Sequence, residues 1–340
     1  MKISRKKFIS DSFILGTGSL LLPGFSSDNE TVMTVNGLLS SQKMGFTLTH
    51  EHIMADFIGA DKFSRDRYNP DEVVQVALPF IKDIQAKGVN TFIDCGPVYL
   101  GRDVHIQKRI SDMTGMNIMT TTGYYGAVNE KFVPAHAYNE TARQLADRWI
   151  SEWKNGIEGT AIKPGLIKTS TDKGPLTPMQ RKLIEAAGIT HLETGLTIAI
   201  HTGDGAAAFE QLDILKQLSV APAAKIWVHT QSEPDSEMHI RAAKLNGWVS
   251  FDGVNPATLQ DNLVYLKRMK ANGLLGQVLV SQDSGWYHVG EPNGGNFKPY
   301  NCISTRFIPL LQQNGFTSAE LDGIFKINPA KAFSIRVRKY

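Results

Sequence analysis

Two histidines separated by one residue give the first indication of chemistry in this sequence. His50 and His52 lie in Thr-His-Glu-His at the end of a short apolar run. A spacing of two along a strand places both imidazoles on the same side of the pleat, where they would crowd together. Buried polar groups need partners, and a divalent cation is a good partner for two imidazoles. The pair favours a metal site, although strand histidines can also be hydrogen-bonded core residues.

Further potential ligands follow later apolar runs. Imidazole and carboxylate ligands together suit zinc, manganese, iron or cobalt. So many candidate ligands at the ends of separate runs would be an unusual coincidence without a metal. The sequence therefore predicts a metal centre, with these ligands: His50, His52, Lys168, His201, His229 and Asp283.

Lys168 requires a chemical change before it can bind a cation. Apolar residues precede it in PGLIK, and burial of an ammonium disfavours the charged form and lowers its pKa. A neutral amine can react with carbon dioxide to give a carbamate, an anionic ligand whose two oxygens can bridge two metal ions. The alternative is a lysine at a rim whose ammonium reaches water or an acidic partner.

The ligands are distributed over a regular alternation of elements. Short β-rich runs recur along the chain: GFTLTH, NTFIDCG, NIMTTTG, PGLIKTS, LTIAIHTG, KIWVHTQ, WVSFDG and QVLVSQD. Helical periodicity appears between several of them, over residues 70–87, 177–194, 205–218, 237–245 and 262–273. Apolar strands alternating with helices over roughly 300 residues predict an α/β fold, a (β/α)₈ barrel whose parallel strands are buried on both faces. We assign residues 32–340 to this single domain.

A doubly wound open sheet is the rival architecture. It is disfavoured because no GxGxxG follows the first strand and no GxxxxGK[ST] occurs anywhere, so the usual ligands of that fold lack a binding loop. In a barrel, the carboxyl ends of all strands open onto one rim, where active sites are built. The polar residues at the run ends, which include Asp94, Thr122 and Asp252, would then share that rim.

The first residues differ in kind from the rest of the chain. Basic MKISRKKF precedes the largely apolar FILGTGSLLLPGF, which is too short for a membrane-spanning helix of about 20 residues. We predict an export signal over residues 1–27 and a periplasmic location, with no stable membrane span in the mature chain. SRKKFIS resembles the twin-arginine motif, with Lys6 in place of the second arginine. A tail retained in the cytoplasm is the alternative.

The charge distribution bears on possible partners. The formal net charge is +3, and the basic residues of the N-terminal segment account for it, so the body is neutral. Because phosphate binding depends on clustered Lys and Arg, we expect a small-molecule substrate and no nucleic acid. The two cysteines, Cys95 and Cys302, lack CxxC spacing. Two buried thiols and a single disulfide both remain open.

The motifs GFTLTHEH, GLIKTS, IHTGDG, WVHT, SQD and the late INPAKAF together resemble the phosphotriesterase family of the amidohydrolase superfamily, over nearly all of the chain after the leader. The resemblance implies a hydrolase with two divalent ions, with zinc expected first and manganese, iron or cobalt as alternatives. It also implies that one ion is held by His50, His52 and Asp283, the other by His201 and His229, and that carbamylated Lys168 bridges both.

The expected mechanism follows from charge. Two cations about 3.5–4 Å apart lower the pKa of a bridging water enough to supply hydroxide near neutral pH. We expect Asp283 to act as the general base that accepts the proton of that hydroxide. Family members that cleave phosphotriesters commonly carry an acidic residue shortly after the sixth-strand histidine. Ser232 stands there in this chain, with Glu233 and Asp235 as candidates to replace it.

Rim loops hold the clues to the substrate. Tyr125 follows Gly123 by two positions, as a tyrosine does in the family's lactone-hydrolysing branch, and favours an acyl substrate; packing is the alternative. That branch usually has an arginine where this chain has Gly253. We expect hydrolysis of a carboxyl ester or lactone. Phosphotriester hydrolysis and a non-catalytic metal-binding barrel are the alternatives. The aromatic loop from Ser284 to Tyr300 predicts either a lid or the contact surface of a homodimer.

Overall fold

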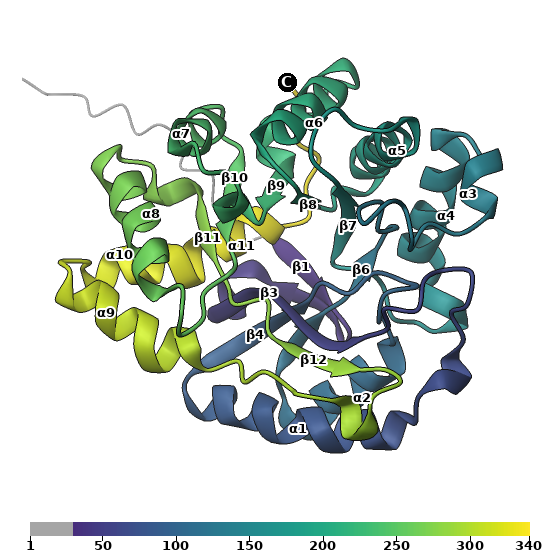
Figure 1. The fold of residues 1–340 in the computed structure, drawn as a ribbon, viewed down its shortest axis with the longest axis horizontal. Helices are drawn as coiled ribbons and strands as arrows, with labels where there is room; N and C mark the ends of the chain where they lie inside the picture. Colours follow the sequence, from purple (N-terminus) through teal and green to yellow (C-terminus); the bar gives the residue numbers. More distant parts are fainter. Residues whose placement is uncertain (1–29) are drawn as a thin grey trace, which may run out of the picture.

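Parallel strands arranged in a ring form the centre of the fold (Figure 1). The computed structural model describes residues 30–340, and the predicted leader, residues 1–27, lies outside the described residues. Neighbouring barrel strands pair in parallel. In chain order they are β3 (Phe46–Ala55), β4 (Val89–Asp94), β5 (Asn117–Met119) with β6 (Thr121–Thr122), β7 (Leu166–Thr171), β8 (Ile198–Thr202), β9 (Lys225–Val228), β10 (Trp248–Phe251) and β11 (Val278–Val280).

The ring closes between its first and last strands. The backbone N–H of Asp283 donates to the carbonyl of His50 at 3.1 Å, and the hydroxyl of Thr49 lies 3.4 Å from the carbonyl of Val280. β5 and β6 are one barrel strand interrupted at Thr120. The predicted (β/α)₈ barrel is therefore confirmed, and the open doubly wound sheet is wrong.

Two short strand pairs are added to the ring. β1 (Thr31–Thr34) and β2 (Gly37–Ser40) form an antiparallel hairpin that precedes the barrel. β12 (Gly285–His288) follows β11 and pairs in parallel with the second half of β3. β3 therefore lies between β4 and the segment that follows the last barrel strand, so residues 50–52 and 281–285 are neighbours.

Helices surround the ring and alternate with the strands (Figure 1). The periodic segments of the sequence correspond to α1 (Pro70–Ala86), α5 (Pro178–Thr194), α6 (Gly205–Gln217), α7 (Ser236–Lys244) and α8 (Leu259–Ala271). The sequence analysis does not predict the others: α2 (Val104–Thr114), α3 (His136–Asn139), α4 (Ala142–Asn155), α9 (Ile308–Gln313), α10 (Ser318–Asp322) and α11 (Asn328–Phe333). Several of these are shorter than two turns, a length at which tertiary packing rather than local pattern maintains a helix.

Side-chain caps fix where the helices nearest the rim begin. Asp204 accepts a hydrogen bond from the backbone N–H of Ala207 at 2.9 Å and starts α6 shortly after β8. Thr177 and Gln180 form a capping box at the start of α5. Such caps satisfy N–H groups that have no partner in the first turn of a helix. They therefore set the lengths of the loops that carry rim residues.

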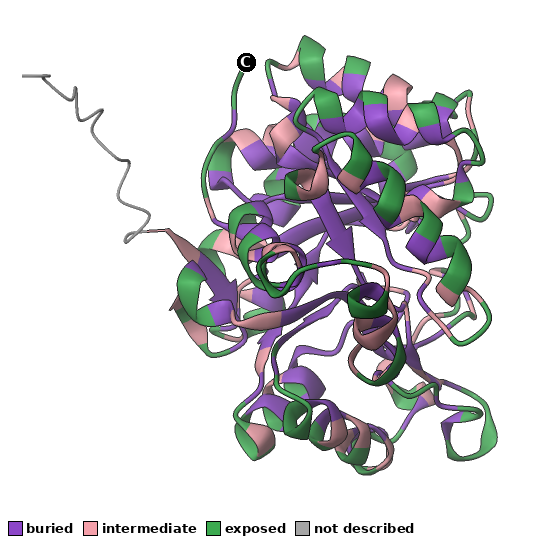
Figure 2. Cartoon of the chain, turned by 90° about the vertical axis from the view of Figure 1, so that its left-hand side faces the viewer, coloured by how far each residue is buried: buried purple, intermediate pink, exposed green. Residues whose placement is uncertain are grey.

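Alternation along the strands separates the barrel interior from the side that faces the helices. On β7, Leu166 packs inside with Ile93, whereas Ile167 packs with Leu183 of α5. Because side chains alternate along a strand, Lys168 lies on the same side as Leu166. Figure 2 shows the strands buried beneath helices whose outer faces are exposed. The position of Lys168 in the interior explains why its side chain is only 1% exposed.

The amino ends of the strands are covered by the first and last parts of the described chain. Val32 of the hairpin and Phe333 of α11 join the interior cluster there. Cys95 and Cys302 are both buried and both free, as expected for two buried thiols and not for a disulfide. Among the described residues, no helix combines the length and the apolar character needed to cross a membrane.

Candidate metal centre

A cavity of about 180 Å³ opens at the carboxyl ends of the barrel strands. The structure thus brings together the six predicted metal ligands and Tyr125. These are His50, His52, Tyr125, Lys168, His201, His229 and Asp283. The rest of the wall is mostly apolar and comes from rim loops: Phe57, Leu100, Val128, Lys131, Phe132 and Trp286.

Three of the predicted ligands converge on one point. Nε2 of His52 lies 3.3 Å from Nε2 of His50 and 3.1 Å from Oδ1 of Asp283. The same oxygen lies 3.7 Å from Nε2 of His50, and it is buried without a hydrogen bond of good geometry. Buried polar atoms are rarely left in that state. Two imidazole nitrogens and an unsatisfied carboxylate oxygen that face one another form a donor set suited to a divalent cation.

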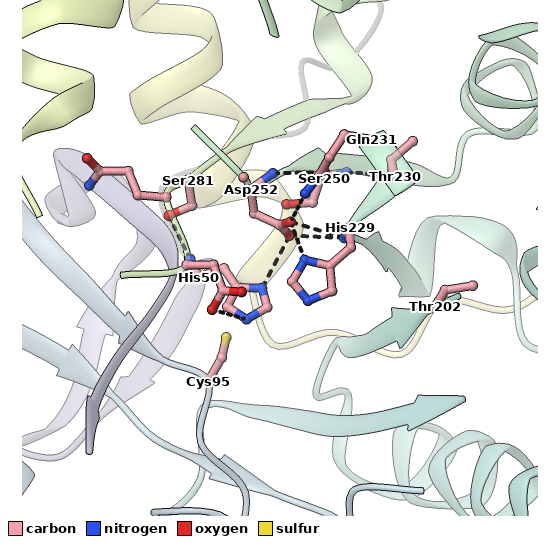
Figure 3. Close-up of polar contacts among 12 residues, drawn as sticks. His50, Cys95, Thr202, His229, Thr230, Gln231, Ser250, Asp252 and Ser281 are labelled. Atoms are coloured by element: carbon pink, nitrogen blue, oxygen red, sulfur yellow. Dashed lines mark hydrogen bonds and ion pairs between the residues drawn. The ribbon is translucent and has the colours of Figure 1, made fainter. Parts of the chain in front are cut away.

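Asp252 contacts two of the histidines on the side away from the cavity (Figure 3). One carboxylate oxygen lies 2.7 Å from Nδ1 of His229, and the other lies 3.2 Å from Nδ1 of His50. The side-chain amide of Gln231 also donates to Asp252 at 3.1 Å. Burial opposes protonation of His229, but the charge of Asp252 raises its pKa. When Nδ1 of each ring carries the proton shared with Asp252, the Nε2 lone pairs are free to bind a metal ion.

His201 and Tyr125 form the adjacent part of the wall. The ring centre of His201 lies 4.5 Å from that of His229 and 5.3 Å from that of Tyr125. The hydroxyl of Tyr125 forms no hydrogen bond with any residue in the described part of the chain. Burial, together with the charge of Asp283, raises the pKa of Tyr125 above its usual range. The phenol therefore stays protonated and is free to donate a hydrogen bond to a substrate.

Lys168 lies in the interior wall of the cavity. Within residues 30–340 its ammonium forms neither an ion pair nor a hydrogen bond, although the side chain is 1% exposed. An isolated buried ammonium is costly. The alternative of a rim lysine that reaches water or an acidic partner does not describe this side chain. Its ammonium therefore lacks the partner that a buried charge needs.

Burial controls ionisation in the cluster. Burial and the nearby charge of Lys168 lower the pKa of His50 to about 3. The pKa of His201 is also lowered, chiefly by burial. Burial opposes ionisation of Asp283, but the histidines around it, His52 foremost, hold its pKa below the usual range. His50 and His201 are thus neutral beside an ionised carboxylate, the states in which these side chains bind cations.

Left-handed backbone conformations direct two of the side chains. His229 has φ 62 and Asp283 has φ 52. Residues other than glycine seldom adopt this conformation, and surrounding contacts must maintain it. Val228 packs inside the barrel, so regular alternation would direct His229 away from the interior. The left-handed turn therefore brings His229 to the cavity.

Glu51 holds the backbone on both sides of Asp283. Its Oε1 accepts hydrogen bonds from the hydroxyl of Ser281 at 2.7 Å and from the N–H of Gln282 at 3.0 Å. Its Oε2 accepts one from the N–H of Ser284 at 2.8 Å. Glu51 is fully buried. Its carboxylate therefore stabilises the turn between β11 and β12 that presents Asp283.

The position expected to hold a proton-relay acid after His229 has none. Ser232 is exposed and does not line the cavity. Glu233 accepts a backbone hydrogen bond from Gly205 at 2.7 Å, and Asp235 caps the start of α7. Neither acid belongs to the cavity wall. Both stabilise local structure outside the cavity wall.

Gly253 stands where the lactone-hydrolysing branch usually has an arginine, and the space beside it is occupied by the side chain of Gln231. A Cβ at this position would lie 2.8 Å from Nε2 of Gln231. That amide nitrogen donates to Asp252. A larger residue at position 253 would displace the side chain of Gln231 from Asp252, the carboxylate that contacts His50 and His229.

The aromatic residues of the loop 284–300 are divided between the cavity and the interior of the fold. Trp286 lines the cavity, with its ring centre 4.6 Å from that of His52 and 5.4 Å from that of Phe57. This loop therefore supplies part of the cavity wall. The other large rings are buried and do not form a surface patch: Tyr287, Phe297 and Tyr300.

Known proteins resemble this chain over most of its length. The sequence profile of the phosphotriesterase family matches residues 30–333. The phosphotriesterase homology protein of Escherichia coli (strain K12) is 28% identical over 299 residues, which cover 87% of this chain and 100% of that protein. The aryldialkylphosphatase of Saccharolobus solfataricus is 29% identical, with coverage of 87% and 97%. The N-acetyltaurine hydrolase of Mus musculus is 25% identical, with coverage of 89% and 98%.

The fold also matches solved structures. A variant of the organophosphorus hydrolase from Deinococcus radiodurans superposes with a TM-score of 0.81 at 24% identity, and the match covers 89% of this chain and 97% of that one. At this identity the likeness bears on the fold alone. It supports the same barrel architecture.

Proposed function

Because this chain belongs to the phosphotriesterase family, a family of hydrolases with binuclear metal centres, we propose that it hydrolyses a carboxyl ester or lactone with two divalent cations. In this proposal His50, His52 and Asp283 hold one cation, and His201 and His229 hold the other. A carbamate formed on Lys168 would supply an anionic ligand shared by the two cations. The shared cavity, the unsatisfied Oδ1 of Asp283 and the unpaired Lys168 support this assignment. The nitrogen and oxygen donors favour zinc, and manganese, iron or cobalt also suit them.

The chain's own residues have distinct roles in this reaction. When bound, the cations lower the pKa of a water molecule and withdraw charge from the bond to be cleaved. Asp283 accepts the proton of the attacking water, because its carboxylate is ionised and faces the cavity. Asp252 keeps Nε2 of His50 and of His229 directed at the cavity through its contacts with their Nδ1 atoms.

Tyr125 is the observation that favours an acyl substrate. Its hydroxyl is protonated, has no partner among the described residues and lies in the wall beside His201. A donor in that position can stabilise the negative charge that develops on a carbonyl oxygen during attack. The missing acid at Ser232 adds support, since phosphotriester-cleaving members commonly have one there.

Two relatives widen the range of substrates to test. The name N-acetyltaurine hydrolase denotes cleavage next to a carbonyl group, so amides join esters and lactones in the proposed acyl class. The name aryldialkylphosphatase supports phosphotriester hydrolysis as the second candidate. Both relatives are matched over most of their length, so neither is preferred on coverage.

A substrate panel tests the proposal. We expect metal-loaded enzyme to hydrolyse lactones, aryl esters or amides with higher kcat/KM than phosphotriesters. Tyr125→Phe should lower kcat/KM for the acyl substrates by roughly tenfold, about 1.4 kcal/mol, without changing metal content. The matched control is Tyr124→Phe, since Tyr124 is buried next to it and does not line the cavity. A preference for phosphotriesters, or an equal loss on both classes in Tyr125→Phe, would count against the acyl assignment.

A further inference from the structure

One cation in the cavity wall has no part in the reaction proposed above. Lys131 lines the cavity next to Phe132, and its Nζ lies 5.7 Å from the centre of the Phe132 ring. Across residues 30–340 the ammonium forms no ion pair and no hydrogen bond. Among the described residues, the other lysine in the wall is Lys168, in the interior. Lys131 therefore supplies a positive charge at the exposed part of the cavity that no neighbouring side chain neutralises.

A strained turn places Lys131 at the cavity. The three preceding residues, Val128, Asn129 and Glu130, have φ values of 58, 53 and 62. The left-handed conformation costs about 1–2 kcal/mol for each residue other than glycine, and it is especially unusual for a β-branched valine. Three such residues in succession persist only where surrounding contacts require them, and strain of this kind concentrates at functional sites.

Strand β7 supplies the contacts that hold this turn. Asp172, which directly follows β7, accepts hydrogen bonds from the N–H groups of Val128 at 2.8 Å and Asn129 at 3.3 Å. The hydroxyl of Ser170 accepts one from the N–H of Ala127 at 2.8 Å. The strand that carries Lys168 thus also supports the turn, so the position of Lys131 is coupled to the metal-binding end of the barrel.

The loop after β3 fixes Lys131 from the other side. The N–H of Ala60 donates to the carbonyl of Lys131 at 3.0 Å. A Cβ on Gly59 would lie 3.3 Å from Cγ of Lys131, so glycine leaves room for the lysine stem. Two segments far apart in sequence therefore hold the backbone of Lys131, which reduces the freedom of its side chain at the cavity.

Two acidic side chains near the turn, Asp172 and Glu130, are engaged in hydrogen bonds with other residues. Asp172 also accepts a hydrogen bond from the side-chain amide of Gln180 at 2.9 Å. Glu130 accepts hydrogen bonds from the hydroxyls of Tyr138 at 3.1 Å and Thr177 at 2.6 Å. Neither acid lines the cavity. Asp61, on the loop after β3, is a third nearby acid, since a Cβ on Gly59 would lie 3.1 Å from its Oδ1 and 3.3 Å from Cγ of Lys131. None of the three acids forms an ion pair with Lys131 among residues 30–340. A bound anion can therefore supply the direct partner that the ammonium lacks.

We propose that Lys131 binds an anionic group of the substrate, a carboxylate or a sulfonate, while the acyl group faces the predicted metal ligands. This inference depends on the proposed function in one respect, the assumption that an acyl bond is cleaved. The aromatic wall suits an apolar or aromatic body between the two ends, since it contains Phe57, Phe132 and Trp286. Apolar walls also strengthen an interaction between opposite charges relative to water. The substrate class is thus an acyl compound with a hydrophobic body and an anionic terminus.

The test compares three aryl acetates that differ in one substituent: para-acetoxybenzoate, para-acetoxybenzenesulfonate and the neutral para-acetoxybenzamide. The quantity measured is the ratio of kcat/KM for each anionic ester to that for the neutral one, in metal-loaded enzyme at low and high ionic strength. We expect Lys131→Ala to lower this ratio five- to tenfold, mainly through KM. Lys131→Glu should lower it further, and Lys131→Arg should retain most of it. If only one of the two anionic esters responds, that anion is the one recognised.

Two lysine controls separate direct contact from general attraction. Lys298 has its Nζ 5.9 Å from the Trp286 ring centre but does not line the cavity, and Lys82 is an exposed residue of α1. Lys298→Ala and Lys82→Ala should leave the ratio within about twofold of wild type, because exposed charges at a distance are screened by salt. If Lys298→Ala lowers the ratio as much as Lys131→Ala does, steering by overall charge replaces the contact that we propose.

A binding measurement keeps this inference separate from the proposed function. Calorimetry with para-hydroxybenzoate and para-hydroxybenzamide measures recognition of the anion without turnover. Loss of the preference for the benzoate in Lys131→Ala would support the inference even if none of the acetates were hydrolysed, an outcome that would count against the proposed function alone. Hydrolysis of all three acetates with the same ratio in wild type and Lys131→Ala would overturn the inference and leave the proposed function intact.

Discussion

Asp252 determines which ring nitrogen of two neighbouring histidines is free to bind a metal ion. Its carboxylate contacts Nδ1 of both His50 and His229, which come from strands at different places in the chain. The imidazole tautomer depends on which nitrogen has an acceptor. One buried carboxylate therefore determines that both rings direct Nε2 at the cavity.

Replacement of Asp252 by Asn tests this role. The amide can accept a hydrogen bond from one imidazole, but its NH₂ group would face the other and favour the wrong tautomer there. We expect Asp252→Asn to weaken metal affinity by about 10- to 100-fold, as measured by competition with a chelator. Asp94→Asn is the matched control, because Asp94 is equally buried at the end of β4 but contacts Gln107 instead of a histidine. Wild-type affinity in Asp252→Asn would contradict the orienting role.

At the scale of elements, the site depends on how strands end. The predicted ligands do not all lie at strand ends: His50 and His52 lie within β3, Lys168 lies within β7 and His201 is near the end of β8, whereas His229 and Asp283 follow β9 and β11. All six line the same cavity. β9 and β11 are each followed by a residue in a left-handed conformation close to the cavity, His229 and Asp283. Regular strands would direct these side chains by alternation alone. The breaks after the strands therefore matter as much as the strands.

The turn between β11 and β12 can be tested through Glu51, which binds the N–H groups of Gln282 and Ser284. Burial raises the pKa of Glu51 to about 8, so the comparison is made above that pH, where both oxygens of the carboxylate accept hydrogen bonds. In Glu51→Gln, one of the two acceptor oxygens becomes a donor and can no longer satisfy its backbone partner. We expect Asp283 to shift, and kcat to fall by about tenfold with a smaller change in KM, because a shift of about an ångström at a catalytic group can cost that much or more.

The matched control for this turn is Ser281→Ala. It removes one hydrogen bond to Glu51 and the acceptor of the His50 backbone N–H, but leaves both backbone contacts of Glu51 in place. Metal affinity is therefore measured in both variants, so that a disturbance of His50 is recognised separately. Its effect on kcat should be several times smaller, while its effect on thermal stability should be similar in size. Equal losses of kcat in the two variants would indicate a general loss of stability instead of a specific effect on Asp283.

At the scale of the whole molecule, two buried lysines lie in different parts of the barrel. Lys168 lies in the wall of the cavity, whereas Lys225 begins β9 and donates to the carbonyl of Ala208 at 2.7 Å. Both are almost fully buried. Burial lowers the pKa of Lys225 to about 7. The fold thus tolerates a buried lysine that has only a carbonyl partner, and the two positions differ in what surrounds them.

Metal content tests the binuclear centre in the intact chain. We expect elemental analysis of loaded protein to give about two ions per chain. Metal removal should lower the melting temperature, because ligands that bind the native state stabilise it.

Lys168→Ala should lose activity and recover part of it with short-chain carboxylates. Lys225→Met, the matched control, should show no response to carboxylates. One ion per chain with full activity, or normal metal content and rate in Lys168→Ala without additive, would contradict the bridged centre.

The sequence by itself determined the barrel and the candidate metal ligands that line its cavity. Both depend on local pattern: apolar runs of strand length, helical periodicity between them, and polar residues such as His201 directly after a run. In a parallel barrel the carboxyl ends of all strands meet at one rim, so the residue type and its position in a run suffice to predict that such side chains lie together. The resemblance to the family rests on the same motifs.

Only the tertiary structure decided which other groups act on that cavity. Asp252, Glu51 and Lys131 lie in segments whose partners are distant in sequence, and no periodicity indicates a contact between a loop and a strand end. The left-handed conformation of His229 likewise depends on contacts that form after the strands assemble. Local propensity specifies elements, whereas the direction and partner of a side chain at the rim depend on where the closed ring brings other segments.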